Sequence, residues 1–314
     1  MGRYIVHRLI SAVPVLLIVT LISFCVMQLV PGDPASMMAG PQATRTEIEQ
    51  VRAQLGLDQP FLHQLGRWYL GLAQGDLGRS ILLGRSVAQA IAERLPVTIA
   101  LAALSFAFTL AIGIPCGIVA ALRQNSWIDQ AVMTVALIGV SLPNFWLGLM
   151  LIVLFSVTLD LLPAGGYAPL AQGLGPWFRS LLLPAVSLGL LQVGLLARIT
   201  RSTMLEILRQ DYIRTARAKG LPALKVIGKH ALKNAMIPVV TIIGIIFSLL
   251  LSGSVVIETV YSLPGLGRLL ATSIFSRDYP VIQGGLLLTA AMFGAVNLLV
   301  DVLYAALDPR VRYD

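Results

Sequence analysis

Six long apolar stretches restrict what this chain can fold into. A run of about 20 apolar residues can cross a bilayer as an α-helix, and in lipid only helices and closed barrels satisfy every backbone hydrogen bond. The chain is 57% hydrophobic and only 12% charged, about half the charged share of a soluble domain. We therefore predict an all-α integral membrane protein with about six transmembrane helices. The candidate spans are residues 9–30, 96–122, 131–159, 181–204, 236–260 and 281–307.

The distribution of Lys and Arg predicts the orientation of these spans. Loops on the cytoplasmic side carry an excess of both residues, and residues 198–233, from the end of the fourth span to the start of the fifth, hold nine against Glu206 and Asp211. The nine are Arg198, Arg201, Arg209, Arg214, Arg217, Lys219, Lys225, Lys229 and Lys233. We predict that both termini and residues 199–236 are cytoplasmic. The net charge of +8 then indicates topology and contact with lipid head groups rather than nucleic acid.

Residues 199–236, the basic segment, have an internal order that predicts two helices and a turn. Four apolar or small residues fall at helical spacing and could pack as one stripe; they are Leu205, Leu208, Tyr212 and Ala216. Gly220 and Pro222 then form a helix stop, because Gly tolerates positive φ and Pro cannot continue a helix. A second helix would carry Lys225, Lys229 and Lys233 on one face.

Composition alone is satisfied by an ordinary positive-inside loop with some helix, but the order of residues is more specific. The run Thr215-Ala216-Arg217-Ala218-Lys219-Gly220 and the His-Ala-Leu-Lys-Asn-Ala segment 230–235 resemble the coupling loop of ABC importer permeases of the dipeptide/oligopeptide branch. Where the wider family has Glu-Ala-Ala, this chain has Arg214-Thr215-Ala216, and Leu232-Lys233 stands in place of a Leu-Pro. An ATPase contact through an acidic residue at the first position is therefore not expected.

Three other stretches carry the same resemblance. The corner Val-Pro-Gly-Asp-Pro at 30–34 and the segments 261–268 and 277–283 are similar to the exit of the first helix and the last outer loop of peptide-type permeases. The resemblance thus extends along most of the chain. It implies one transmembrane permease domain, residues 1–314, with the type I ABC importer permease fold, in the bacterial cytoplasmic (inner) membrane. Residues 31–95 would be an outer segment.

The resemblance also implies partners and a substrate class. A homologous second permease, two cytoplasmic ATP-binding subunits and an extracytoplasmic solute-binding protein would complete the importer, in which this chain forms half of the translocation path. Short peptides are the expected substrate. The same branch serves glutathione, nickel chelates, oligosaccharides and opines, which stay open as alternatives.

Six residues of the basic segment are the candidates for coupling to an ATPase: Tyr212, Arg214, Thr215, Ala216, Lys219 and Gly220. In this hypothesis Gly220 serves the turn, Ala216 allows close approach, and the basic side chains complement an acidic rim on the partner.

Four polar residues are candidates for the pore or gate: Ser141, Asn144, Glu258 and Asp301. Ser141 and Asn144 flank a proline inside a span, where a freed carbonyl needs a neighbour or a cavity; hydrogen bonding between helices is the alternative use. Glu258 could order the outer loop with Arg268, or form a surface ion pair or none. A carboxylate inside a span usually faces a cavity or a partner, although Asp301 could also reach the basic loop.

Residues 31–95 contain signals for two further helices. Thr46 is placed to cap a helix that ends at Gly56, and residues 61–72 have amphipathic spacing. Trp68 and Tyr69 are residue types that settle at a membrane interface. This outer segment is either an interfacial cap or part of the surface that receives a solute-binding protein.

The sequence has no Gly-rich phosphate loop of the Walker type. We therefore predict that the chain is not an enzyme, has no catalytic, cofactor or metal site of its own, and leaves ATP and Mg to partner subunits. Two rival functions remain. An ion-coupled secondary transporter predicts inverted repeats and ionisable residues at the midplane, and a membrane scaffold or sensor predicts no solute flux.

Overall fold

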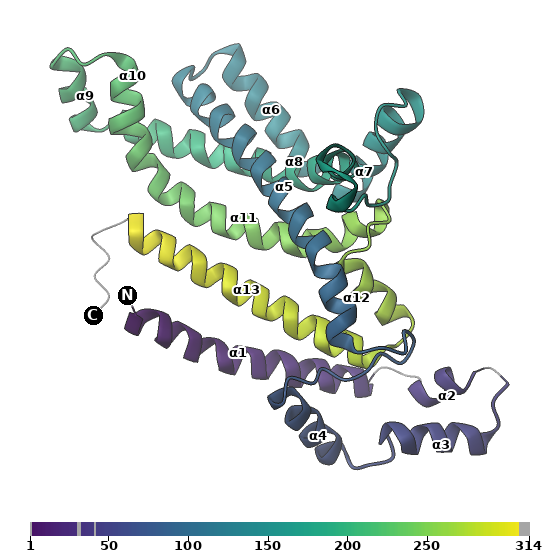
Figure 1. The fold of residues 1–314 in the computed structure, drawn as a ribbon. Helices are drawn as coiled ribbons and strands as arrows, with labels where there is room; N and C mark the ends of the chain where they lie inside the picture. The colour runs from purple at the N-terminus through teal and green to yellow at the C-terminus, as the bar shows by residue number, and fades with distance from the viewer. Residues whose placement is uncertain (1, 30–32, 41, 308–314) are drawn as a thin grey trace. The chain divides into compact units, whose positions relative to one another are not determined.

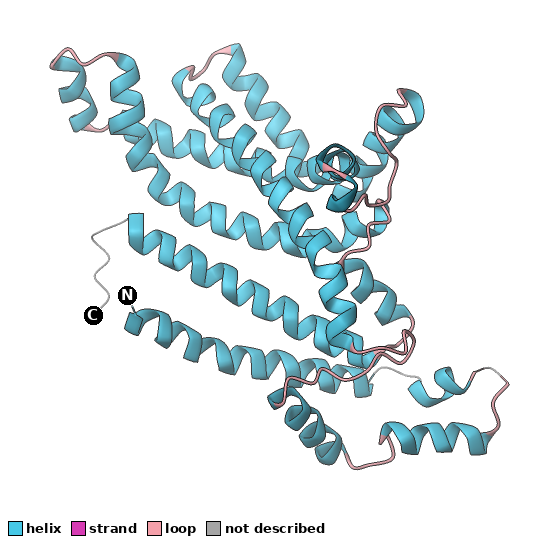
Figure 2. Cartoon of the chain, viewed as in Figure 1, coloured by secondary structure: helices cyan, strands magenta, loops and turns pink. Residues whose placement is uncertain are grey.

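The structure is a computed structural model that describes residues 2–29, 33–40 and 42–307 (Figure 1). Regular structure in this part of the chain is helical, and strand-like pairing is limited to one isolated bridge between Arg79 and Ser86 (Figure 2). The predicted all-α fold is confirmed. The chain forms two compact units: Met1–Pro96 with Gly265–Ala295, and Val97–Pro264 with Val296–Asp314. We call them the outer-loop unit and the central unit; the single permease domain stays a prediction.

Helix α5 (Val87–Leu122) begins in the outer-loop unit and continues into the central unit. The other helices of the outer-loop unit are α1 (Gly2–Leu29), α2 (Pro34–Ala39), α3 (Arg45–Leu55), α4 (Phe61–Ala73), α12 (Leu266–Phe275) and most of α13 (Tyr279–Leu307). Those of the central unit are α6 (Trp127–Ser141), α7 (Asn144–Leu151), the π-helix η1 (Ile152–Thr158), the 3-10 helix η2 (Leu170–Gln172), α8 (Leu174–Leu208), α9 (Asp211–Ala218), α10 (Ala223–Lys225), the π-helix η3 (Val226–Leu232) and α11 (Lys233–Val260).

Among the described residues, four helices are long and apolar enough to cross a membrane: α5, α8, residues Pro238–Val260 of α11 and Tyr279–Val300 of α13. The pair α6 and α7–η1 makes a fifth if it is counted as one bent span. The remaining predicted span, residues 9–30 at the start of the chain, overlaps α1. The apolar segment described there, Ile10–Cys25, is shorter than the roughly 20 residues that cross a bilayer. A multi-pass membrane protein is therefore confirmed, whereas the number six and the side of the termini stay predictions.

The predicted span 131–159 is broken instead of continuous. Its two halves, Trp127–Ser141 and Asn144–Thr158, are bent by 105°. Pro143 is the physical reason, because it lacks an N–H and pushes the preceding residue away from helical angles; Leu142 has φ −87° and ψ 132°. The Ser141 hydroxyl donates back to the Leu137 carbonyl at 2.9 Å, as serine often does where a helix bends.

Glycines bring the backbones of α5, α6 and α8 close together. A Cβ atom on Gly194 would lie 2.5 Å from the Ala136 carbonyl oxygen, and one on Gly117 would lie 2.6 Å from that of Ala197. Helices in lipid gain little from the hydrophobic effect, so they depend on such tight van der Waals packing. These contacts fix the register of three of the helices of the central unit.

Tyr261, just past the end of α11, joins several elements of the central unit. Its side chain is buried, and its hydroxyl lies 2.8 Å from Ser187 Oγ and donates to the Gly148 carbonyl at 3.1 Å. The Tyr261 carbonyl accepts from the Gly166 N–H at 2.9 Å. One residue thereby ties α7, α8 and the loop after η1 to the end of α11.

The outer-loop unit contains the two helices predicted after the first span, with one correction. Thr44, and not Thr46, caps α3: its hydroxyl accepts from the Glu47 N–H while the Glu47 carboxylate accepts from the Thr44 N–H at 2.7 Å. This reciprocal capping box requires Glu three residues after the cap. The Thr44 backbone hydrogen bond, helped by the Thr44 hydroxyl, lowers the pKa of Glu47. Gly56, with φ +68°, ends α3 as predicted.

The predicted corner at 30–34 is only partly described, since residues 30–32 lie outside the described residues. Asp33 caps α2 through the Ala35 N–H and accepts from Arg52 at 2.7 Å.

Trp68 of α4 packs inside the outer-loop unit. Its side chain is half-buried, and its ring centroid lies 6.1 Å from that of Phe24 in α1.

A buried carboxylate holds the loop before α5. Asp278 accepts from the Ser80 hydroxyl and, at 3.2 Å each, from the backbone N–H groups of Ile81 and Leu82. The Leu83 N–H in turn donates to the Ser80 oxygen at 2.9 Å. A loop and a turn that are 198 residues apart in the sequence are thus fastened together.

We expect Gly194→Ala to destabilise the protein by about 1–3 kcal/mol, because the added methyl meets the backbone of α6 and forces the helices apart. Gly294→Ala in α13 is the matched control. A Cβ there meets nothing within 4 Å, and alanine is favoured over glycine in a helix by about 0.5–1 kcal/mol. Thermal unfolding in detergent checks both. Equal melting temperatures for the two variants would contradict the proposed role of close packing.

Candidate coupling site

The basic segment folds as a helix, a turn and a second helix. Helix α8 ends at Leu208, α9 occupies Asp211–Ala218, and the chain continues from Ala223 through α10 and η3 into α11. In Figure 1, α9 and α10 lie together beyond the joined ends of α8 and α11. The predicted order of elements is confirmed.

Gly220 makes the turn after α9. Its φ is +74°; its N–H donates to the Arg217 carbonyl at 2.9 Å, and the Leu221 N–H donates to the Ala216 carbonyl at 3.4 Å. These two bonds form a Schellman motif, in which a left-handed residue satisfies the last carbonyls of a helix. A Cβ at Gly220 would meet nothing within 4 Å. Glycine is therefore required for its backbone angles and not for space.

A buried apolar cluster packs the basic segment against the ends of the neighbouring long helices. It consists of Ala121, Met204, Ile213, Ala216, Val226, Ala231 and Ala235. These residues come from α5, α8, α9, η3 and α11. The small side chain of Ala216 thus allows α9 to approach the other helices of this cluster closely.

One detail of the predicted stripe is wrong. Leu205 and Leu208 pack against the cluster, but Tyr212 is 42% exposed and Ile213 takes the inward position. The chain leaves the helix between Leu208 and Asp211, which shifts the register that an unbroken helix would keep. The Tyr212 hydroxyl instead accepts from Asn234 Nδ2 at 3.0 Å.

The outward face of α9 and its turn is polar and exposed. Arg214, Thr215 and Lys219 are all exposed. Arg214 lies 3.4 Å from Asp211 in an exposed pair, a kind that contributes little to stability, and Thr215 donates to the Asp211 carbonyl at 3.0 Å. The side chains predicted to meet a partner are therefore presented on a helix whose opposite face is fixed.

The second helix differs from the prediction in its geometry. Lys225, Lys229 and Lys233 are exposed, as expected for a basic face. The middle of the helix is a π-helix, Val226–Leu232, a rare form that is common at functional sites. The spacing of three lysines does not distinguish a π-helix from an α-helix, so the sequence contained no signal for it.

An ion pair that sequence reasoning missed joins one arginine of this segment to α6. Arg201 Nε and Nη2 donate to Asp129 Oδ1 and Oδ2 at 2.5 and 2.7 Å, and Asp129 is only 3% exposed. Asp129 also accepts from the Asn125 N–H at 2.9 Å. The basic segment holds eight Lys and Arg residues, and no pattern in the sequence singles out the one that pairs with Asp129.

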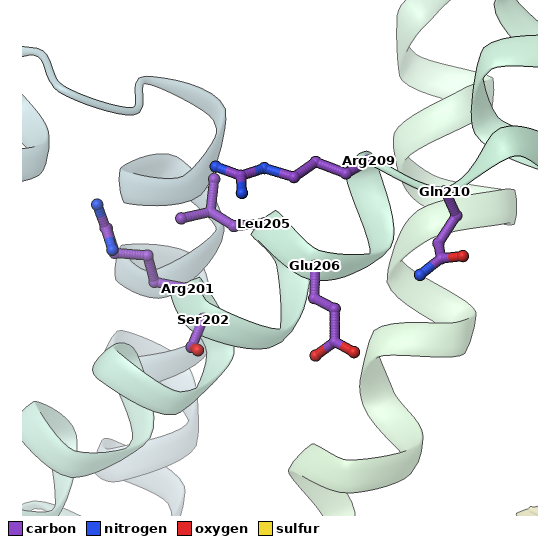
Figure 3. Close-up of a pocket in the computed structure, with 6 residues that line it drawn as sticks. All are labelled: Arg201, Ser202, Leu205, Glu206, Arg209 and Gln210. Carbon is purple, nitrogen blue, oxygen red and sulfur yellow. The ribbon is translucent and has the colours of Figure 1, made fainter.

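A pocket of about 430 Å³ opens at the end of α8. It is lined by Arg201, Ser202, Leu205, Glu206, Arg209 and Gln210. Figure 3 shows the guanidinium groups of Arg201 and Arg209 extending to the same side, with the Glu206 carboxylate on another. The end of α8 therefore presents opposite charges in different directions.

The pore and gate candidates are held in different ways. Ser141 is exposed, and Asn144 is half-buried with an Oδ1 atom that has no hydrogen-bond partner among the described residues. Glu258 is fully buried and accepts from the Thr98 hydroxyl at 2.6 Å; its predicted relation to Arg268 stays a prediction. Asp301 belongs to α13, but its side chain lies outside the described residues.

Comparisons with known proteins agree with this geometry. Residues 113–313 match the family described as "Binding-protein-dependent transport system inner membrane component", and residues 1–102 match the N-terminal part of such membrane components. A solved structure of the methionine ABC transporter MetNI in an inward-facing conformation has a TM-score of 0.60 at 20% identity, covering 70% of this chain and 97% of that one. The fold is therefore that of a type I ABC importer permease. The chain belongs to the family of binding-protein-dependent ABC importer permeases.

Curated relatives match over the whole length. A protein of Brucella abortus (strain 2308), provisionally named a peptide transport system permease protein, is 54% identical over 314 residues, with full coverage of both chains. The glutathione transport system permease protein GsiC of Escherichia coli (strain K12) is 45% identical over 313 residues, again with full coverage. Members of this family are membrane subunits rather than enzymes.

Replacing Gly220 tests the turn. Gly220→Ala forces a residue with a Cβ into the left-handed region, which costs about 1–2 kcal/mol, whereas Gly220→Asn should cost less because asparagine tolerates that region. We expect faster hydrogen exchange over 211–221 in the alanine variant than in the asparagine variant. Gly228→Ala is the control, since it has neither a positive φ nor a close neighbour. Indistinguishable exchange in all three would show that the turn does not depend on Gly220.

Proposed function

We propose that this chain is the transmembrane permease subunit of an ATP-driven ABC importer in the bacterial inner membrane, where it forms half of the translocation path. The observation that supports this most is the arrangement of α9. One face packs against a buried cluster that includes α5, α8 and α11, and the other presents Arg214, Thr215 and Lys219 to solvent. A short helix fixed in this way can transmit a push from a partner to the spans that carry it.

In the proposed mechanism two cytoplasmic ATP-binding subunits close on ATP and carry α9 with them. Because Ile213 and Ala216 belong to the same buried cluster as Met204 of α8 and Ala235 of α11, a shift of α9 would tilt those spans. The permease would then change between inward-facing and outward-facing states. ATP binding acts as a ligand that favours one of two states, and ATP and Mg remain on the partner subunits.

The remaining coupling candidates have supporting roles in this proposal. Tyr212 is positioned by Asn234 at the start of α11, so a partner that contacts its exposed ring also contacts that span. Gly220 sets the angle between α9 and the second helix. The basic side chains would complement an acidic rim on the ATPase.

The proposed substrate is short peptides, delivered by an extracytoplasmic solute-binding protein. The peptide name of the Brucella abortus relative supports this class, and glutathione, itself a short peptide, is the alternative suggested by the Escherichia coli relative. Asn144 lies beside the break between α6 and α7, and its Oδ1 has no hydrogen-bond partner in the described part of the chain; it is the residue we propose to line the path. A second, homologous permease would supply the other half.

Affinity purification from the native membrane tests the partners. We expect two ATP-binding subunits and a second permease to copurify, and Gly220→Pro to abolish ATPase recovery because it removes the left-handed turn. Gly84→Pro is the matched control: Gly84 also has a positive φ, +63°, with open space around it, but lies in the loop before α5. Equal loss from both variants would point to misfolding. Full recovery with Gly220→Pro would contradict the coupling role.

Uptake by proteoliposomes tests the energy source and the substrate. Vesicles that contain the purified complex and the binding protein should accumulate a labelled dipeptide or tripeptide only with internal ATP. Glutathione uptake in preference to these peptides would select the alternative substrate. Uptake by this chain alone along an ion gradient would replace the importer with a secondary transporter.

A further inference from the structure

The ion pair between Asp129 and Arg201 links α6 to α8. Of these two helices, only α8 contributes a residue to the buried cluster that packs against α9. The cluster beneath α9 includes residues of α5, α8, η3 and α11, but among the described residues none of α6. Near the basic segment, α6 is joined to α8 by this pair. At that end, Asp129 is thus the residue of α6 through which a charged side chain of α8 is bound.

The other end of α6 leads to the broken span. Helix α6 has 15 residues from Trp127 to Ser141, which corresponds to about 22 Å. Asp129 lies in its first turn, and its last residue precedes the 105° bend at Pro143. Midway, Gly194 of α8 meets the Ala136 backbone too closely for any side chain. The helix is thus a rod, held to α8 at one end and in the middle, that ends beside Asn144.

We infer that the Asp129–Arg201 pair is a permanent joint that carries movement of α9 and α8 into α6 and so to the bend at Pro143. Opening the pair would leave a buried carboxylate without its counter-charge, which is costly. Both oxygens of Asp129 are engaged by Arg201, and Oδ2 also accepts from the Asn125 N–H, so the contact has little freedom. Asp129 and Arg201 are positioning residues in this scheme, which rests on the proposed ATP-driven function.

The first test compares uptake with ATP hydrolysis in proteoliposomes that contain the complete importer. Asp129→Asn should lower solute uptake about tenfold while hydrolysis stays within about twofold of wild type, since coupling and not ATP binding is lost. Glu93→Gln is the matched control, because Glu93 accepts from Arg85 at 2.7 Å in an exposed pair of the outer-loop unit. A proportional fall in solute uptake and ATP hydrolysis, or no change in either, would contradict the proposal that the pair transmits movement.

A covalent bridge at positions 129 and 201 shows whether the contact between α6 and α8 stays closed during transport or has to open. In a background in which Cys25 and Cys116 are replaced by serine, Asp129→Cys and Arg201→Cys are connected by a short bifunctional methanethiosulfonate. Restored uptake supports a contact that stays closed throughout transport. Uptake that stays as low as in the unbridged double variant, or falls further, would show that a closed contact does not support transport, and the proposal would be wrong.

A third measurement needs neither ATP nor partners. Spin labels at Trp127→Cys and Arg209→Cys, both exposed positions, should give a narrow distance distribution that broadens when Asp129→Asn is added. An unchanged distribution would overturn the joint. If wild-type vesicles take up solute without ATP, the proposed function fails, and the labels still decide whether α6 and α8 are held together.

Discussion

The close backbone approach of α6 to α8 is the constraint on which the rest of the central unit depends. Gly194 lets the Ala136 carbonyl come within the space that a side chain would fill, and in lipid such van der Waals packing replaces the hydrophobic effect as the source of helix association. With the two helices in this register, Asp129 reaches Arg201 with both oxygens. A buried ion pair contributes little net stability compared with apolar residues of the same size, so the glycine contact supplies most of the packing energy, while the pair fixes the first turn of α6 against α8.

The basic segment shows how a hydrophobic chain presents a polar surface without losing its shape. Its inward residues, Ile213 and Ala216, are buried by α8 and α11, and its outward residues are free of strong pairing, since the Arg214–Asp211 contact is long and exposed. Exposed charges that are not paired can meet a partner without first breaking a bond. The packing of the buried face therefore holds α9 in place, and the side chains of its exposed face remain available to bind a partner.

Sequence reasoning predicted what depends on composition and short-range order. Long apolar runs predicted the spans within α5, α8, α11 and α13, and the helix stop at Gly220 followed from the backbone freedom of glycine. It could not predict what depends on tertiary packing. Placing Tyr212 inward instead of Ile213 assumed an unbroken helix, and the pairing of Asp129 with Arg201 requires knowing which helices are neighbours. The π-helical geometry of η3 has no residue pattern of its own, so only the structure reveals it.

The bond network of Asp278 has a consequence for how the protein is made. Ser80 precedes its carboxylate partner by 198 residues, and ribosomes add about 5–20 residues per second. The loop before α5 therefore waits about 10–40 s before the group that orders its backbone N–H groups is synthesised. Throughout that interval the N–H groups of Ile81 and Leu82 lack the carboxylate that accepts from them in the folded protein. Synthesis of Asp278, and not insertion of the first helices, is therefore the step that allows this loop to form its hydrogen bonds.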